Sequence, residues 1–435
     1  MAEHARLLRR HRAVMPSWLA LNYDEPIEIA GGAGARVTDA EGGRYLDFFT
    51  GILSNMIGYA VPEVREAVER QLATGVVHTS TAYLLRGQVE LAEKIARLSG
   101  IPDAKVFFTN SGTEANETAL LLAVRARRTD QVLAMRQAYH GRSFGAMGVT
   151  GNRAWTNVPY SPLNVHFLHG ADRDRPLFAG MPDAAYIDAC VQDLRHVLAA
   201  AAGGDVAALI AEPIQGVGGF TMAPDGLFAA YKEVLDEHGI LFVSDEVQTG
   251  WGRTGQGFFG IENHGVVPDM MTFAKGLGNG FAVGGVVARG ELMDGPTAVG
   301  LSTFGGNPLS MAAANATLDY VLRHDLQANA AKQGAFLIGG LEEAAGRLPS
   351  VRAVRGKGLM FAVELVDPGT GGPGPALAAA AMEAARARGL LVGKGGLYGN
   401  VLRMAPPLNL TGEEAAEGLG ILIGALESVD EAVRT

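Results

Sequence analysis

Lysine and carboxylate side chains at the ends of two apolar runs could carry chemistry in this sequence. Lys275 follows the apolar run 271–273 and precedes the glycine-rich stretch 276–280. Burial at such a position lowers the pKa of an amine and makes it a nucleophile that can form a Schiff base with a carbonyl compound. Asp245 ends the apolar run 240–244. A carboxylate at the end of a strand could bind Mg²⁺ or hold a protonated ring nitrogen, and the residues alone leave both interpretations open.

A second group of polar residues, Ser111, Gly112 and Thr113, comes shortly after the apolar run 105–108 and opens a segment of helical period. The free N–H groups of a helix start, together with two hydroxyls, form a natural cradle for a phosphate. The same residues would also serve as an ordinary N-cap, with Glu114 favouring the helix dipole. Taken by themselves, these residues support both interpretations equally.

Glycine-rich nucleotide motifs offer a rival interpretation. Residues 250–255 match G-x-G-x-x-G and come shortly after the apolar run 241–243, which makes a nicotinamide-dependent oxidoreductase the distant alternative. The residues that follow, 257–260, do not begin a helix, and the stretch before the glycines is polar and acidic rather than a tight turn. The chain contains no G-x-x-x-x-G-K-[ST] motif.

These residues require a fold that brings the ends of several strands together. Short runs that are apolar on both faces are typical of buried parallel strands, and they lie at 105–108, 207–210, 241–243 and 271–273. Segments of helical length and period lie at 114–127, 225–238 and 308–323. This alternation predicts an α/β fold with a large, doubly wound, mostly parallel sheet.

The two ends of the chain predict a smaller α+β domain. Residues 352–365 resemble a loop that leads into a strand, and a Gly/Pro turn at 368–375 precedes a helix at 376–388. A further strand and a final helix at 413–428 close the chain, and N-terminal strands at 35–38 and 44–47 would complete this unit. We therefore expect three parts: an N-terminal segment 1–59 that contributes to the small domain, a large cofactor-binding domain 60–310, and a C-terminal small α+β domain 311–435.

Composition narrows the class of protein. The chain has 435 residues, of which 48% are apolar, and a formal net charge of -10, which indicates a globular protein that does not bind nucleic acid. Its single cysteine, Cys190, cannot form an internal disulfide, and no Cys/His cluster has zinc spacing. We therefore expect a cytoplasmic protein without a metal. No apolar stretch is long enough to cross a bilayer, so we expect no membrane partner.

The basic start of the chain at 6–12 has two interpretations. It could serve as a mitochondrial transit peptide. We favour a terminal helix that docks on the body of the protein or on a partner subunit, because Trp18, Leu19 and Leu21 are residues suited to packing.

Six groups of residues in a fixed order resemble the class III aminotransferases, which are pyridoxal-phosphate enzymes of fold type I. They are 111–117 (SGTEANE), 139–142 (YHGR), 212–216 (EPIQG), 245–250 (DEVQTG), Lys275 and 303–308 (TFGGNP). The likeness extends from about residue 25 to residue 425. It implies an enzyme that transfers an amino group from a carboxylate-bearing donor to a 2-oxo acid.

The resemblance also implies roles in the cofactor site. Lys275 would form the Schiff base with pyridoxal 5'-phosphate and shuttle a proton, and Asp245 would keep the pyridine nitrogen protonated so that the ring accepts electrons. Tyr139 and Val247 would cover the two ring faces, and Gln248 would hydrogen-bond the phenolic oxygen. The implied cofactor set is Ser111, Gly112, Thr113, Tyr139, His140, Asp245, Val247, Gln248, Lys275 and Thr303.

Subunit and substrate assignments follow from the same resemblance. Thr303 would reach the phosphate held by Gly112 and Thr113 of the other protomer, which implies a homodimer with shared active sites. Arg403 would bind the substrate α-carboxylate in a bidentate manner. Arg142 matches the position that holds a distal carboxylate in aminobutyrate-type and acetylornithine-type members.

Two further positions complete the implied substrate set. Val217 stands where members that act on ω-amino acids with 2-oxoglutarate usually carry a glutamate that neutralises the carboxylate-binding arginine. Ile52 is the last expected substrate residue.

Four segments resemble the alanine:glyoxylate aminotransferase 2 and β-alanine:pyruvate branch of the family, namely 78–81, 215–217, 303–308 and 393–400. This likeness favours alanine or a short ω-amino acid as donor and pyruvate or glyoxylate as acceptor, with 2-oxoglutarate still open. Lyases, epimerases, decarboxylases and aminomutases share the six motifs, so the sequence leaves these reactions open as alternatives.

Overall fold

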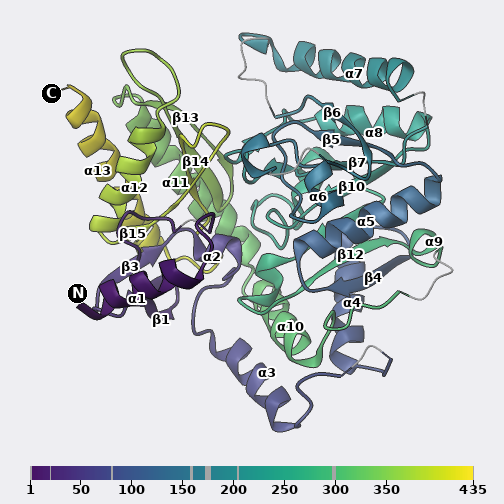
Figure 1. The fold of residues 1–435 in the computed structure, drawn as a ribbon, viewed down its shortest axis with the longest axis horizontal. Helices are drawn as coiled ribbons and strands as arrows, with labels where there is room; N and C mark the ends of the chain where they lie inside the picture. The colour runs from purple at the N-terminus through teal and green to yellow at the C-terminus, as the bar shows by residue number, and fades with distance from the viewer. Residues whose placement is uncertain are drawn as a thin grey trace.

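The computed structural model describes residues 2–19, 21–79, 82–156, 160–171, 178–202, 205–295 and 300–434, and Figure 1 shows the arrangement of their elements. The helices are α1 Ala2–Val14, α2 Thr50–Leu53, α3 Pro62–Ala73, α4 Arg86–Ser99, α5 Gly112–Arg127, α6 Phe144–Gly148, α7 Asp183–Ala200, α8 Leu227–Glu237, α9 Gly290–Met293, α10 Pro308–Arg323, α11 Leu326–Ala345, α12 Pro375–Ala387 and α13 Gly412–Arg434. The 3₁₀ turns are η1 Arg153–Trp155, η3 Gly260–His264 and η4 Lys275–Gly278. The strands are β1 Ile29–Ala33, β2 Arg36–Asp39, β3 Arg44–Asp47, β4 Ala104–Thr109, β5 Gln131–Met135, β6 Asn164–Leu168, β7 Ala208–Ala211, β8 Ile214–Gln215, β9 Thr221–Met222, β10 Leu241–Asp245, β11 Met270–Phe273, β12 Gly284–Arg289, β13 Val351–Lys357, β14 Met360–Leu365, β15 Leu390–Leu391, β16 Gly393–Gly395 and β17 Val401–Met404.

The largest sheet has seven strands in the order β4-β12-β11-β10-β7-β5-β6. Neighbouring strands run parallel except at β12, which is antiparallel to both β11 and β4. The apolar runs that predicted buried strands fall on β4, β7, β10 and β11. The predicted fold class, with a mostly parallel sheet, is therefore confirmed.

Helices cover both faces of this sheet. Successive side chains of each strand point to opposite sides, and because both sides are apolar, both need to be covered. Val132 and Ala134 of β5 belong to a core that contains the apolar residues of α5. Leu133 and Met135 of the same strand belong to the core that contains residues of α7 and α8. The strands thus separate two layers of helices, and the sheet is doubly wound (Figure 1).

Residues from the two ends of the chain share one of the smaller sheets, whose order is β1-β2-β3-β15. Leu46 of β3 pairs in parallel with Leu390 of β15. Figure 1 shows these N-terminal strands beside the C-terminal helices α12 and α13. The N-terminal strands and a C-terminal strand therefore belong to one sheet.

The expectation of a loop at the start of 352–365 is wrong. Residues Val351–Lys357 form β13, which pairs antiparallel with β14 in a sheet of the order β13-β14-β17-β16. The hairpin turns at Gly358, whose φ of 54° favours glycine. No residue of β13 is fully buried. A strand without a buried face need not show the alternation of apolar and polar residues that predicts a half-buried strand, so this strand could not be recognised from its sequence.

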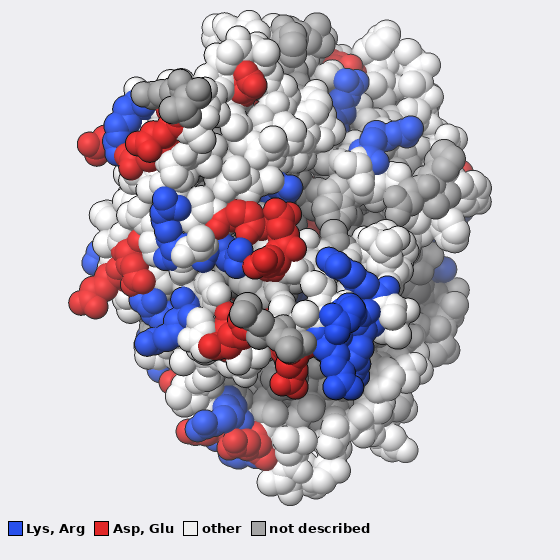
Figure 2. All heavy atoms as spheres, turned by 60° about the vertical axis from the view of Figure 1, so that its left-hand side comes forward, with Lys and Arg blue, Asp and Glu red and all other residues white. Residues whose placement is uncertain are grey.

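Charged residues of both signs share the molecular face drawn in Figure 2, where a basic group and an acidic group lie side by side near the centre. Within the described ranges, no helix combines the length and the apolar character needed to span a membrane.

Candidate active site

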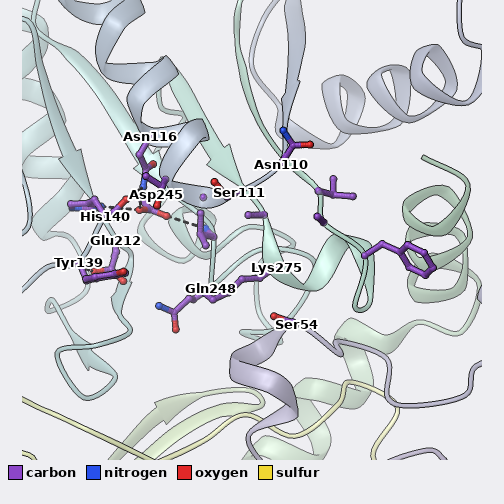
Figure 3. Close-up of a pocket in the computed structure, with 18 of the residues that line it drawn as sticks. Ser54, Asn110, Ser111, Asn116, Tyr139, His140, Glu212, Asp245, Gln248 and Lys275 are labelled. Carbon is purple, nitrogen blue, oxygen red and sulfur yellow. Dashed lines mark hydrogen bonds and ion pairs between the residues drawn. The ribbon is translucent and has the colours of Figure 1, made fainter. Parts of the chain in front are cut away.

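A cavity of about 360 Å³ lies at the carboxyl ends of β4, β5, β7, β10 and β11. Open α/β sheets bind their ligands at this edge. Side chains from these strand ends converge there in Figure 3. The predicted residues that line the cavity together are Ser111, Gly112, Thr113, Tyr139, His140, Asp245, Val247, Gln248 and Lys275.

Lys275 is the first residue of the turn η4, close behind β11. Its φ of 45° lies in the left-handed region, which lysine rarely adopts. Burial lowers the pKa of the Lys275 amine and Arg403 adds to this effect, whereas Asp245 and Glu212 oppose it. Lys275 therefore loses its proton more readily than a surface lysine does.

Asp245 is almost completely buried and is held by three hydrogen bonds. Its Oδ2 accepts from Asn116 Nδ2 at 2.7 Å and lies 2.8 Å from His140 Nδ1, and its Oδ1 accepts from the Val247 N–H at 3.1 Å. Asn116 Oδ1 is fixed in turn by the Thr272 hydroxyl at 2.7 Å. Figure 3 shows Asn116, His140 and Asp245 meeting at one wall of the cavity. The network fixes a carboxylate in one orientation at the site.

The start of α5 forms another wall of the cavity. Ser111 is its N-cap, and the Ser111 hydroxyl accepts a hydrogen bond from the Glu114 N–H at 3.2 Å. The other N–H groups of the first helical turn have no acceptor within the helix and suit an anion. A Cβ at Gly112 would lie 3.0 Å from Val247 Cγ2, so glycine lets the helix start approach the segment after β10 closely. Both roles considered for this segment, N-cap and anion cradle, are therefore compatible.

Glu212 also lines the cavity, although sequence reasoning did not single it out as a site residue. It is 4% exposed, and its two oxygens accept the backbone N–H groups of Tyr139 and Gly216, each at 2.9 Å. Burial raises the pKa of Glu212 to about 7, and the Asp245 carboxylate raises it further, whereas His140 and the two N–H donors lower it. The available signal was its position two residues after the end of the apolar run 207–210, much as Asp245 follows its own run.

Arg403 of β17 is buried behind this cavity and makes hydrogen bonds only to carbonyl groups among the described residues. It donates to Gly216 O at 2.9 Å and to Lys394 O at 3.1 and 3.2 Å. Its guanidinium carbon lies 5.3 Å from the Phe49 ring centroid and 5.6 Å from that of Phe220. Burial lowers the pKa of Arg403 to about 10. A buried cation in this state favours an anionic ligand.

The remaining predicted residues, like Arg403, do not line the cavity. Val217 is buried, and Thr303 is exposed in the single chain. Arg142 is exposed, and its guanidinium carbon lies 4.9 Å from the centroid of the Trp18 ring. Within the segment 78–81, residues 80 and 81 lie outside the described residues.

A left-handed turn at residues 50–53 borders the site. All four residues have φ between 48° and 64°, a conformation that costs roughly 1–2 kcal/mol for each residue other than glycine. Two backbone N–H groups at the start of the turn donate to Asp47 Oδ1, each at 2.8 Å. The turn holds Ser54 at the cavity wall and places Ile52 in a separate hollow of about 270 Å³.

Comparisons with known proteins agree on one family. The family model described as aminotransferase class-III matches residues 20–426. The chain is 40% identical to the alanine–glyoxylate aminotransferase 2 homolog 2 of Arabidopsis thaliana, over 94% of this chain and 84% of the relative. It is 37% identical to the acetylornithine aminotransferase of Corynebacterium efficiens, over 93% of this chain and 94% of the relative. The crystal structure of a Bacillus anthracis aminotransferase matches the fold with a TM-score of 0.90 at 30% identity, covering 98% of this chain and 99% of that one.

Proposed function

Because this chain belongs to the class III aminotransferases and takes pyridoxal phosphate as its cofactor, we propose that it moves an amino group from alanine or a short ω-amino acid to pyruvate or glyoxylate. The observation that carries this choice of substrates is the buried Arg403, whose hydrogen-bond partners in the described chain are carbonyl groups. Val217 supplies no charge at the position where, by the family resemblance, members that act on ω-amino acids with 2-oxoglutarate usually carry a glutamate. A substrate that brings its own carboxylate is therefore favoured at Arg403.

The cavity fits a phosphorylated pyridine. The N–H groups at the start of α5 would hold the phosphate, and Asp245 would face the ring nitrogen. Tyr139 and Val247 would cover the ring faces. Within the described structure, Gln248 Oε1 is buried without a hydrogen-bond partner, so the cavity still offers a polar group to a ligand.

Pyridoxal phosphate, when bound, supplies an electron sink that makes the Cα proton of an amino acid acidic. We assign the proton transfer to Lys275 Nζ, because burial lowers its pKa and leaves the amine ready to accept a proton. Asp245, which its three hydrogen bonds hold in one orientation, would place a carboxylate at the ring nitrogen of the bound cofactor. Arg403 orients the substrate by its carboxylate.

The position of Arg142 supports a small acceptor. Its guanidinium carbon lies 4.9 Å from the centroid of the Trp18 ring. Arg142 must give up this contact before it can bind the distal carboxylate of 2-oxoglutarate, which disfavours that acceptor. Pyruvate and glyoxylate carry a single carboxylate and need only Arg403.

We also propose that the enzyme is a cytoplasmic homodimer. Thr303 is exposed between the exposed apolar side chains of Leu301 and Phe304, as expected of residues that a second subunit covers. The chain has a single cysteine and therefore cannot form an internal disulfide, which suits a reducing compartment. The pairing of β3 with β15 supports the division into segments 1–59, 60–310 and 311–435, with the N-terminal segment completing the small domain.

The test is a matrix of amino donors and acceptors on the purified enzyme loaded with pyridoxal phosphate. With β-alanine as common donor, we expect kcat/KM for pyruvate and for glyoxylate to exceed that for 2-oxoglutarate. Consumption of many equivalents of amine per enzyme site without any 2-oxo acid would contradict transamination and select a lyase-type reaction. A preference for 2-oxoglutarate would contradict the substrate assignment alone.

A further inference from the structure

Glu212 connects two parts of the site that come from distant segments of the chain. We propose that Glu212 is a positioning residue, whose ionised carboxylate fixes the ring-facing Tyr139 and the carboxylate-binding Arg403 relative to each other. This inference rests on the roles proposed above for Tyr139 and Arg403. Glu212 itself touches neither the substrate nor the reacting atoms in this scheme.

The geometry is a short chain of hydrogen bonds. Glu212 Oε1 accepts from the Tyr139 N–H and Glu212 Oε2 accepts from the Gly216 N–H, each at 2.9 Å. The Gly216 carbonyl then accepts from Arg403 Nη1, also at 2.9 Å. One buried side chain therefore sets the position of the loop that carries Tyr139 and of the carbonyl that orients Arg403.

Gly216 has little freedom to move within this chain of contacts. A Cβ at this position would lie 2.1 Å from Gln248 Nε2, so the backbone of residue 216 packs directly against that amide. A shift of Gly216 would displace Arg403 or Gln248. Loss of the hydrogen bond from the Gly216 N–H to Glu212 would therefore change the positions of Arg403 and Gln248 directly, through the backbone of Gly216.

The charge of Glu212 is part of the arrangement. The groups that face it are His140, Asp245, Lys275, Tyr139 and Arg403. The field of Glu212 opposes the effect of burial on the pKa of Arg403 and so stabilises the guanidinium. Each oxygen of Glu212 accepts a hydrogen bond from one backbone N–H group. When the carboxyl group is protonated, only one of its two oxygens is free of a proton. Protonation of Glu212 would therefore weaken the hydrogen bond to one of the two segments.

The sign of the pH effect follows from the pKa of Glu212, which burial raises to about 7. Above pH 7 the carboxylate is ionised and holds both N–H groups. Below pH 7 the carboxyl group is increasingly protonated. We therefore expect the affinity of the enzyme for a carboxylate ligand to fall as the pH drops from 8 to 6.

The experiment compares wild-type holoenzyme with Glu212→Gln, using propionate as a carboxylate probe that lacks an amine. The variant should raise the propionate inhibition constant roughly ten- to a hundred-fold, the range for losing a hydrogen bond to a charged group. It should also remove the part of the pH dependence between pH 6 and 8 that Glu212 causes. Visible circular dichroism of the bound cofactor supplies a readout independent of turnover, and its amplitude should fall because Tyr139 is less firmly held.

Glu246→Gln is the matched control. Glu246 is buried beside Asp245, and its oxygens accept hydrogen bonds from the Thr249 hydroxyl and the Gly260 and Ile261 N–H groups, none of which holds Tyr139 or Arg403. The control should lower the melting temperature and leave the propionate constant and its pH dependence unchanged. An equal change in both variants would overturn the positioning role.

A third variant separates this inference from the proposed function. If Arg403→Ala weakens propionate and Glu212→Gln does not, only the role of Glu212 fails. If Arg403→Ala has no effect on propionate, the substrate assignment and the role of Glu212 fail together. Should Glu212→Gln not fold, Glu212→Asp decides the matter, because it keeps the charge but shortens the side chain, and an unchanged propionate constant in that variant overturns the inference.

Discussion

Replacing Trp18 with alanine should shift acceptor preference toward 2-oxoglutarate, because it frees the guanidinium of Arg142. The guanidinium carbon lies 4.9 Å from the Trp18 ring centroid, and Trp18 is 65% exposed, so the contact is a solvent-exposed cation–π pair. Such pairs contribute about 0.5–1 kcal/mol, which corresponds to a factor of roughly two to five. We expect kcat/KM for 2-oxoglutarate relative to pyruvate to rise by that factor.

The assay measures both acceptors with one common amino donor in wild type, Trp18→Ala, Trp18→Phe and the double variant Trp18→Ala/Arg142→Ala. Phenylalanine keeps an aromatic ring and should retain most of the wild-type ratio. The double variant should lose the gain, because no guanidinium remains to bind the distal carboxylate. An unchanged ratio in Trp18→Ala, or a gain that persists without Arg142, would refute the reasoning.

Four further outcomes are expected. Lys275→Ala should lose at least roughly 10²–10⁴-fold in rate with the proton transfer, and borohydride reduction of wild type followed by peptide mapping should locate the cofactor on Lys275 and on no other lysine. Asp245→Asn should slow a single turnover with alanine by about ten-fold or more while the protein stays folded, and an unchanged rate would contradict its role. Mixed dimers of Thr303→Val and Lys275→Ala subunits should recover one intact site each, whereas sites built within one chain would recover none. Val217→Glu should give Arg403 a partner and lower kcat/KM for alanine relative to a monoamine by roughly ten-fold, and a ratio that stays constant would refute that interpretation.

Much of the large sheet can be predicted from the sequence because its strands are buried on both faces. The run 241–243 has no polar residue, and the helical period at 308–323 coincides with α10 Pro308–Arg323. Strand direction is not encoded in such runs, so the antiparallel insertion of β12 between β4 and β11 cannot be read from them. The partly exposed β13 lacks a periodic signal for the opposite reason, since neither of its faces is fully buried.

In the site as well, residues marked by their local sequence can be predicted, whereas residues whose role depends on contacts between distant segments cannot. Lys275 and Asp245 are predictable because each ends an apolar run where strand ends meet. The importance of Glu212 depends on which N–H groups lie within reach, and those belong to segments that only the fold brings together. The contact between Trp18 and Arg142 likewise cannot be predicted from the sequence, because no local pattern around either residue indicates that the two lie close together.

The sheet that combines both ends of the chain cannot form until almost the whole chain has been synthesised. The Tyr23 hydroxyl donates to the carbonyl of Val392, 369 positions later, and β3 pairs with β15 nearby. At about 5–20 residues per second, a ribosome needs roughly 20–70 s to make the chain between these partners. During that time the edge of β3 is open to other strands, which promotes aggregation. Chaperones that shield such edges should therefore raise the yield of newly made enzyme. A chain that ends just before β15 should leave β3 without its neighbour, so loss of the C-terminal strand should also destabilise the N-terminal strands.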